Sequence, residues 1–193
     1  ETTLVMLTPR AQHGESSFEA GGWFRRNTDD YEFDRYRPGL CNPYEHETRL
    51  IGTFAEMTRP VGEWKAHVRG EFAADQIDST SLTAGRFNSR SIWRLAALGS
   101  RNWRAGANGD LELRLGGALD DTNREGSAFS PLARLAWTRS RQPDAPLVRL
   151  HVEASRASRV PGYTALNSAA GAGLFRGNPE LGREKSTSFE TGV

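Results

Sequence analysis

Apolar and polar residues alternate with a period of two along three segments of the chain. Between residues 64 and 75 the even positions are apolar and the odd positions mostly polar, and Val68 is one of the apolar ones. The same division occurs at 111–120, where Leu113 has the apolar parity, and at 147–155, where Leu150 has it. Because successive side chains of a β-strand point to opposite faces, this pattern predicts three amphipathic strands.

Weaker alternation predicts further strands. It occurs at 18–24, 48–57, 91–103 and 131–138, and strand-like residues also occupy 2–8 and the stretch from 187 onward. No segment of useful length has apolar residues at helical spacing together with capping residues, so helices are expected only as short turns in loops. The sequence therefore predicts an all-β protein of about nine long strands.

The connections between these strands alternate in length. Short connections are expected at 9–14, 59–63, 104–109 and 141–146, long ones at 29–45, 76–90 and 157–183, and one of medium length at 121–129. In an up-and-down antiparallel sheet, this alternation places the tight turns at one end and the extended loops at the other. Bacterial outer-membrane barrels have this asymmetry, with short periplasmic turns and longer extracellular loops.

Strand length and tryptophan position favour the same interpretation. The clear strands with their flanks run to about 10–13 residues, against about 5–6 in globular sheets and about 9–11 for a tilted membrane-spanning strand. Trp64, Trp103 and Trp137 lie toward the short-turn end, as in an interfacial aromatic girdle, whereas Arg101 has the apolar parity and departs from the pattern. The prediction is an antiparallel up-and-down transmembrane β-barrel segment. The alternative is a soluble or surface-anchored β-sandwich that binds a partner or glycan.

Composition excludes several other classes. The 193 residues are 37% hydrophobic and 25% charged, and no apolar stretch approaches the roughly 18–20 residues that a transmembrane helix needs. The net charge of +1 comes from 25 basic and 24 acidic residues that are evenly spread, so nucleic acid is not an expected partner. Cys41 is the single cysteine and is interpreted as an incidental free thiol.

Candidate chemistry is sparse. The four histidines are far apart in the sequence, and none belongs to a metal-binding motif. Acidic pairs at 29–30 and 120–121 stand where strands enter loops, and such pairs can bind calcium, although solvated loop carboxylates are the favoured interpretation. No nucleophile motif or phosphate-binding loop occurs. The sequence therefore predicts no catalytic residue, no metal site and no cofactor.

The most specific motif lies within residues 155–193. It consists of Ser158, Arg159 and Pro161, then Gly177, Asn178, Pro179 and Leu181, then Glu184, and finally Glu190 and Gly192. Together with the segments 29–39, 75–86 and 120–131, this stretch resembles the barrel of TonB-dependent outer-membrane receptors. One departure is that Gly182, Arg183 and Glu184 stand where that family usually has Lys-Pro-Glu.

The resemblance implies a transporter and not an enzyme. Receptors of this family close about 22 strands around an N-terminal plug, so residues 1–193 are expected to form part of a barrel, open or incomplete, without the plug domain. The parent protein would lie in the outer membrane of a Gram-negative bacterium and contact outer-membrane lipid. It would engage TonB through the plug region and import a scarce nutrient such as siderophore-bound iron or a vitamin chelate. Residues 187–193 are then interpreted as the first half of a barrel strand.

Ligand contacts are expected from aromatic and arginine side chains of the long loops. The candidates are Tyr31, Tyr36, Arg37 and Tyr44 in one loop and Tyr163, Phe175 and Arg176 in another. Aromatic faces combined with cationic groups suit an anionic or planar chelate, such as a ferric siderophore or a corrinoid. The alternative interpretation is that these residues only pack the loops together.

Overall fold

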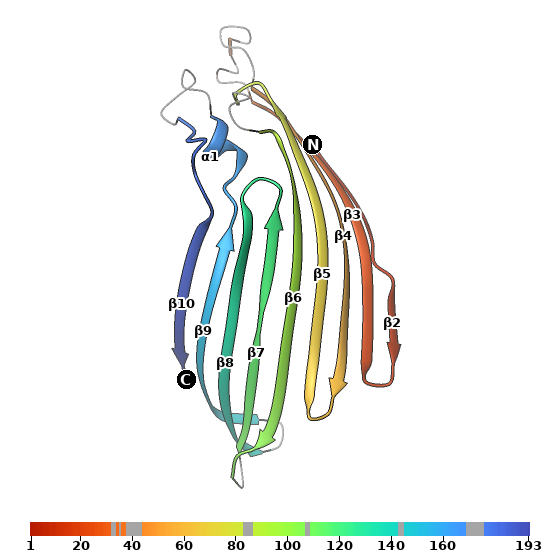
Figure 1. Ribbon diagram of the computed structural model, residues 1–193, viewed down its shortest axis with the longest axis vertical. Coiled ribbons are helices and arrows are strands. Elements are labelled where there is room, and N and C mark those ends of the chain that lie inside the picture. The colour runs from red at the N-terminus through yellow and green to blue at the C-terminus, as the bar shows by residue number, and fades with distance from the viewer. Residues whose placement is uncertain are drawn as a thin grey trace.

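The protein is a single layer of antiparallel β-sheet (Figure 1). The computed structural model describes residues 1–31, 34, 36–37, 44–82, 87–106, 109–142, 145–168 and 176–193. The strands are β1 Thr2–Leu7, β2 Arg10–His13, β3 Ser16–Tyr31, β4 Tyr44–Val61, β5 Trp64–Ser79, β6 Ser89–Arg104, β7 Gly109–Thr122, β8 Gly126–Gln142, β9 Ala145–Arg159 and β10 Glu184–Gly192. The helix α1 covers Tyr163–Asn167. Among the described residues, no helix is long and apolar enough to cross a membrane.

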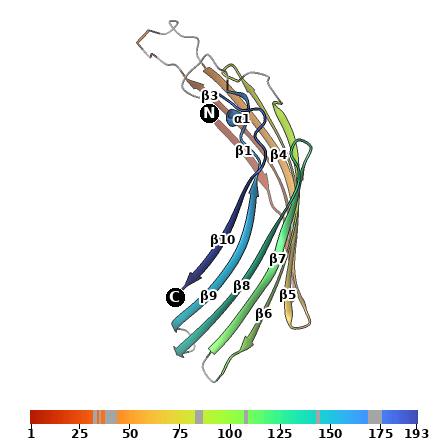
Figure 2. The ribbon, with the colours of Figure 1, turned by 60° about the vertical axis from the view of Figure 1, so that its left-hand side comes forward.

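From β3 to β10 each strand pairs with its neighbour in sequence, and β1 pairs with β3, which gives the order β1-β3-β4-β5-β6-β7-β8-β9-β10. Strand β2 also pairs with β3, as a continuation of β1 beyond Thr8 and Pro9. Proline has no backbone N–H to donate, and an edge strand is where a sheet tolerates it. The predicted all-β, up-and-down antiparallel sheet is confirmed. Its described strands form one curved layer (Figure 2) with no second sheet packed against it, as the sandwich alternative would require.

Two expectations about length are wrong. The strands from β3 to β9 have between 14 and 18 residues, so they are longer than the alternation suggested. The β7–β8 connection, expected at 121–129, is a three-residue turn at 123–125. Strand pairing continues to Thr122 opposite Gly126, whose φ of 65° suits glycine. The Thr122 hydroxyl oxygen accepts a hydrogen bond from the Glu125 N–H at 2.7 Å. Polar residues that suggested a loop are therefore part of the hairpin.

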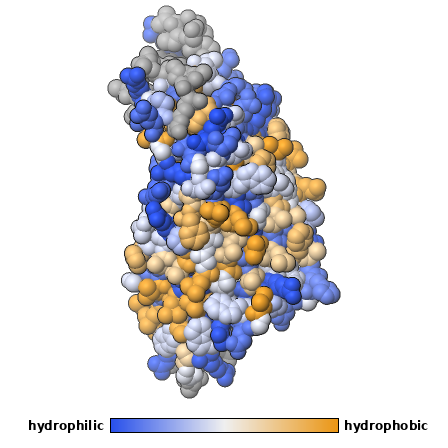
Figure 3. All heavy atoms as spheres, in the orientation of Figure 1, coloured by the Kyte–Doolittle hydropathy of each residue, from blue (hydrophilic) through white to orange (hydrophobic). Residues whose placement is uncertain are grey.

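The two faces of the sheet differ in polarity, as the alternation predicts. The register places Val68 opposite Ala97 and Leu135 opposite Val152, so apolar side chains form continuous rows across one face, called the apolar face here. These rows are uncovered, since Trp93 is 60% and Ile51 59% exposed. Figure 3 shows hydrophobic residues over the middle and lower parts of the molecule and hydrophilic ones over the upper part. Among the described residues, the buried hydrophobic ones are Phe54, Phe87, Ala136, Tyr163 and Leu166.

The opposite face, called the polar face here, carries ion pairs between strands. Arg69 contacts Glu56 at 2.7 Å and Glu71 at 3.2 Å. Farther across the sheet, Glu112 contacts Arg114 at 2.6 Å and Arg149 at 3.5 Å, and Arg134 lies 3.6 Å from Glu153. Charged side chains paired in this way need a wet or protein-lined environment, because isolated charges are costly in hydrocarbon.

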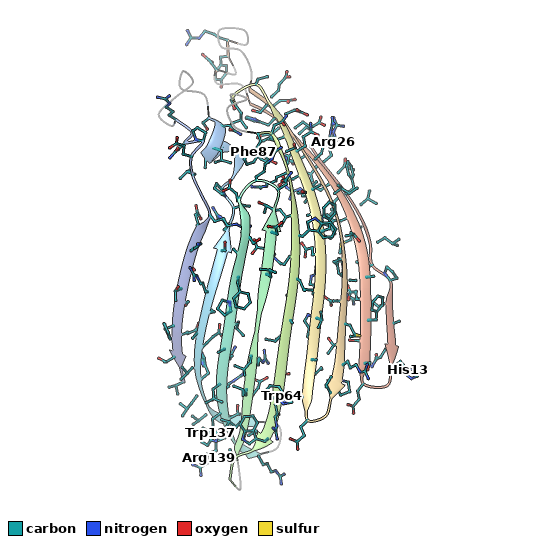
Figure 4. The ribbon with its side chains drawn as sticks, viewed as in Figure 1. His13, Arg26, Trp64, Phe87, Trp137 and Arg139 are labelled. Atoms are coloured by element: carbon teal, nitrogen blue, oxygen red, sulfur yellow. The ribbon has the colours of Figure 1, made fainter. Side chains whose placement is uncertain are left out.

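The short-turn end of the sheet carries the predicted tryptophans. Trp64 and Trp137 lie near this end in Figure 4. The departure of Arg101 from the apolar pattern is explained by its neighbours, because its guanidinium pairs with Glu63 in the β4–β5 turn and lies 5.8 Å from the centre of the Trp103 ring. An arginine at the end of a strand is thus paired at the place where the apolar face ends.

Candidate functional site

The longest connections all leave the same end of the sheet, called the rim here. They are residues 32–43 between β3 and β4, 80–88 between β5 and β6, and 160–183 between β9 and β10. The three-residue β7–β8 turn is at the same end. Because this turn is so short, the rim extends less far there, and the hairpin is called the low hairpin here. In Figure 1, helix α1 occupies the space above this hairpin. Any ligand site built from the connections must therefore be sought here.

Helix α1 is attached to the polar face by a network of hydrogen bonds. The Tyr163 hydroxyl donates to Oδ1 of Asp75 on β5 at 2.6 Å. The Arg90 Nε of β6 donates to both carboxylate oxygens of Asp75, at 3.0 and 3.1 Å. The Arg90 Nη1 donates to the Pro161 carbonyl at 2.7 Å, and its guanidinium carbon lies 4.8 Å from the centre of the Tyr163 ring. Burial, and secondarily the Asp75 carboxylate, raises the pKa of Tyr163, because the phenolate form would be desolvated and would stand beside a negative charge.

A small hydrophobic cluster supports the same helix. Leu166 is 1% exposed, and it packs with Tyr163 and Phe87. The Phe87 and Tyr163 rings meet edge to face, with centroids 6.0 Å apart. The Asn167 side-chain amide donates to the Phe87 carbonyl at 2.8 Å. Figure 4 shows Phe87 beside the helix. The connection after β9 therefore crosses the low hairpin and rests on the β5–β6 pair.

Arg183 makes a second attachment, just before β10 begins. Its guanidinium pairs with Asp120 of β7, and these two side chains are only 5% and 6% exposed. It also donates to the Gly126 carbonyl at 2.6 Å, to the Ser158 hydroxyl at 3.3 Å and to the Glu125 carbonyl at 3.4 Å. A buried ion pair persists when such additional hydrogen bonds satisfy the charged groups. The start of β10 is thus fixed to the β7–β8 hairpin.

The structure separates the predicted ligand residues into two groups. Tyr31 and Tyr44 end β3 and begin β4 as opposed residues, and their side chains lie outside the described part of the chain. Tyr36 is 92% exposed, and the Arg37 Nε donates to Asp34 at 2.8 Å. No contact described in the structure links these residues to the second group.

In the second group, Tyr163 is only 7% exposed and belongs to the α1 attachment. Arg176 is exposed, and Phe175 lies outside the described residues. The role of all these residues in ligand binding stays a prediction. Sequence reasoning missed Asp75, Arg90 and Arg183, because nothing local marks them.

The acidic pairs do not form cation sites in the described structure. Asp120 is paired with Arg183, while Asp121 accepts a hydrogen bond from the Ser127 hydroxyl at 2.7 Å on the other face of the sheet. Consecutive strand residues point to opposite faces, so these two carboxylates cannot converge on one ion. Among the described residues, no group of three His, Cys, Asp or Glu side chains is placed to hold a metal ion.

Comparison with protein families decides the class. The family described as TonB dependent receptor-like, beta-barrel, matches residues 3–193. The chain belongs to this family. No curated protein and no solved structure matches the chain. TonB-dependent receptor barrels belong to outer-membrane nutrient transporters and not to a family of enzymes.

Membership of the TonB-dependent receptor family orients the sheet. In outer-membrane barrels the short turns are periplasmic and the longer loops extracellular, so the rim is the extracellular end. Outer-membrane barrels are apolar on the side that faces lipid and polar on the side that faces the interior, which matches the uncovered apolar rows and the ion-paired polar face of this sheet. Helix α1 lies on the polar face, because Tyr163 contacts Asp75 there.

Proposed function

We propose that this receptor barrel imports a scarce nutrient as a chelate, either siderophore-bound iron or a vitamin of the corrinoid type. The family match over residues 3–193 supports transport across the outer membrane. The candidate ligand residues on the extracellular side combine aromatic rings with guanidinium groups. They include Tyr36, Arg37 and Arg176. Such groups suit a planar or anionic chelate.

We infer that residues 1–193 form one part of a larger closed barrel, with the plug domain supplied from outside this stretch. Within the strands that the structure describes, β1 and β10 are each paired on one side only. An unpaired strand edge has no hydrogen-bond partner within a bilayer, and closure removes such edges. Energy for import would come from TonB acting on the plug, so the barrel wall described here needs no chemistry of its own.

Uptake by whole cells tests this proposal. Cells that produce the complete receptor would be given a radiolabelled ferric catecholate siderophore, a ferric hydroxamate siderophore or cobalamin, with and without functional TonB. Uptake of one class that stops without TonB is expected. Replacing Tyr36 and Arg176 by alanine should raise the KM for that class several-fold at an unchanged amount of receptor, whereas Lys65→Ala at the periplasmic end of β5 should not. TonB-independent uptake, or none of the three classes, would contradict the proposal.

A further inference from the structure

Two connections at the rim contact each other although they are far apart in the sequence. They are residues 80–88 between β5 and β6, and the described parts of residues 160–183 between β9 and β10, called the strap here. Leu82 of the β5–β6 connection forms an antiparallel β-bridge with Ser168 of the strap. Such a bridge fixes both the distance and the relative direction of the two backbones.

Side chains from both connections add to this contact. The side-chain amide of Asn167, in the strap, donates to the Phe87 carbonyl of the β5–β6 connection at 2.8 Å. The hydrophobic cluster at α1 also draws on both, since Leu166 packs with Phe87, and Leu82 and Ile77 lie against them. The strap and the β5–β6 connection therefore bury their apolar side chains against each other.

The strap also folds back onto helix α1. The Asn178 N–H donates to the Ala165 carbonyl at 2.8 Å, and the Gly177 N–H donates to the Ser168 carbonyl at 3.1 Å. A Cβ at position 177 would lie 2.5 Å from the Ser168 nitrogen, so this close approach requires glycine. Helix α1 is thus bonded both to the returning chain and to the β5–β6 connection.

We propose that the strap and the β5–β6 connection form one conformational unit, which opens and closes as a whole. Leu166 and Asn167 are 1% and 3% exposed. Separating the two connections would expose the leucine and would take the Phe87 carbonyl away from the Asn167 amide, and both changes cost free energy. Segments joined in this way open cooperatively. A contact that displaces α1 therefore also displaces the β5–β6 connection.

Hydrogen exchange of the complete receptor in lipid vesicles, measured by mass spectrometry, tests this coupling. Leu166→Ala in the strap should speed exchange in the peptide 77–82 at least about tenfold, because truncating a packed leucine changes a local equilibrium by that factor or more. Phe87→Ala should speed exchange in the strap peptide 163–168, because coupling between two sites is reciprocal. Leu181→Ala is the matched control, since Leu181 belongs to the strap but is 38% exposed, and it should leave the peptide 77–82 unchanged. Faster exchange only in the connection that carries the substitution would overturn the proposal.

A disulfide across the bridge gives the opposite sign and separates coupling from misfolding. Opposed residues of an antiparallel pair are close enough for a disulfide, so Leu82→Cys with Ser168→Cys, combined with Cys41→Ser, would join the two connections. Oxidation should slow exchange several-fold in both peptides relative to the reduced form of the same protein. A damaged fold would not give this result. Slower exchange in one peptide only, or no disulfide under mild oxidation, would contradict a single unit.

Discussion

Arg183 contributes more to the structure than any feature of its local sequence suggests. Its guanidinium contacts Asp120 of β7, and the two side chains are only 5% and 6% exposed. It also donates to three oxygen acceptors, the Glu125 carbonyl of the β7–β8 turn, the Gly126 carbonyl of β8 and the Ser158 hydroxyl of β9. Removing one partner of such a pair leaves an uncompensated buried charge, which typically costs about 3–5 kcal/mol. Exposed pairs contribute roughly 0–1 kcal/mol because water screens them.

We therefore expect Arg183→Ala to lower the free energy of unfolding by about 3–5 kcal/mol, because Asp120 loses its partner. Urea unfolding of the receptor in lipid vesicles, followed by tryptophan fluorescence, measures the change. Arg159→Ala is the control, since Arg159 and Glu184 pair at 3.4 Å with 77% and 66% of their side chains exposed. Similar losses in the two variants would refute the distinction between the buried and the exposed pair.

At the scale of elements, the short β7–β8 hairpin leaves space at the rim, and helix α1 occupies that space. The hairpin ends in a three-residue turn, and the connection after β9 passes over it to reach Asp75 and Arg90. A five-residue helix has little stability of its own. Its position depends on the packing of Leu166 and on the Tyr163 hydrogen bond, so α1 is a docked segment and not an independent element.

Shortening the Leu166 side chain, which packs α1 against the sheet, should release the helix. Leu166→Ala in a tightly packed site costs about 2–5 kcal/mol, and this loss should appear as local opening of α1 with the strands intact. A nitroxide at the exposed Ala165, in the complete receptor in vesicles, should become more mobile in this variant. Thr164→Ala, on the exposed side, should leave its mobility unchanged. An immobile label in the Leu166 variant would show that other contacts hold the helix.

The strands were predictable from the sequence because a period of two is a local signal. Val68, Leu113 and Leu150 have the parity that places them on the apolar face, and the pairing register confirms it. The attachments at the rim were not predictable, since Tyr163 and Asp75 are 88 residues apart and Arg183 and Asp120 are 63 apart. The position of the β7–β8 turn could not be predicted from the sequence, because the polar residues at the ends of these two strands have the composition of a loop.

At the scale of the whole molecule, one face should contact lipid and the other the barrel interior. The ion pairs of the polar face and the uncovered rows of the apolar face place these two environments on opposite sides of a single layer. Consecutive residues of a strand should therefore lie in different environments, one facing lipid and the next facing the barrel interior. We expect this for every strand from β3 to β9.

Spin labels test this division in the complete receptor in vesicles. Labels at Val68, Leu113 and Leu150 should collide readily with oxygen and rarely with a water-soluble nickel chelate, because they face hydrocarbon. Labels at Ala73, Ala96 and Ala118 on the polar face should be shielded from lipid and respond less to oxygen. If the two sets respond alike, the sheet does not separate lipid from a polar interior.

The scarcity of buried hydrophobic residues has a consequence for how the native state is defined. Among the described residues, the compact hydrophobic cluster lies at α1 and its neighbours, and within the strands only Phe54 and Ala136 are buried hydrophobic residues, so the sheet has almost no hydrophobic core of its own. The transfer of its apolar rows into hydrocarbon takes the place of core formation. Bilayer thickness then becomes a determinant of stability, since a membrane thinner than these rows leaves some of them wet. The folding equilibrium of this protein therefore depends on the surrounding lipid as well as on the amino-acid sequence.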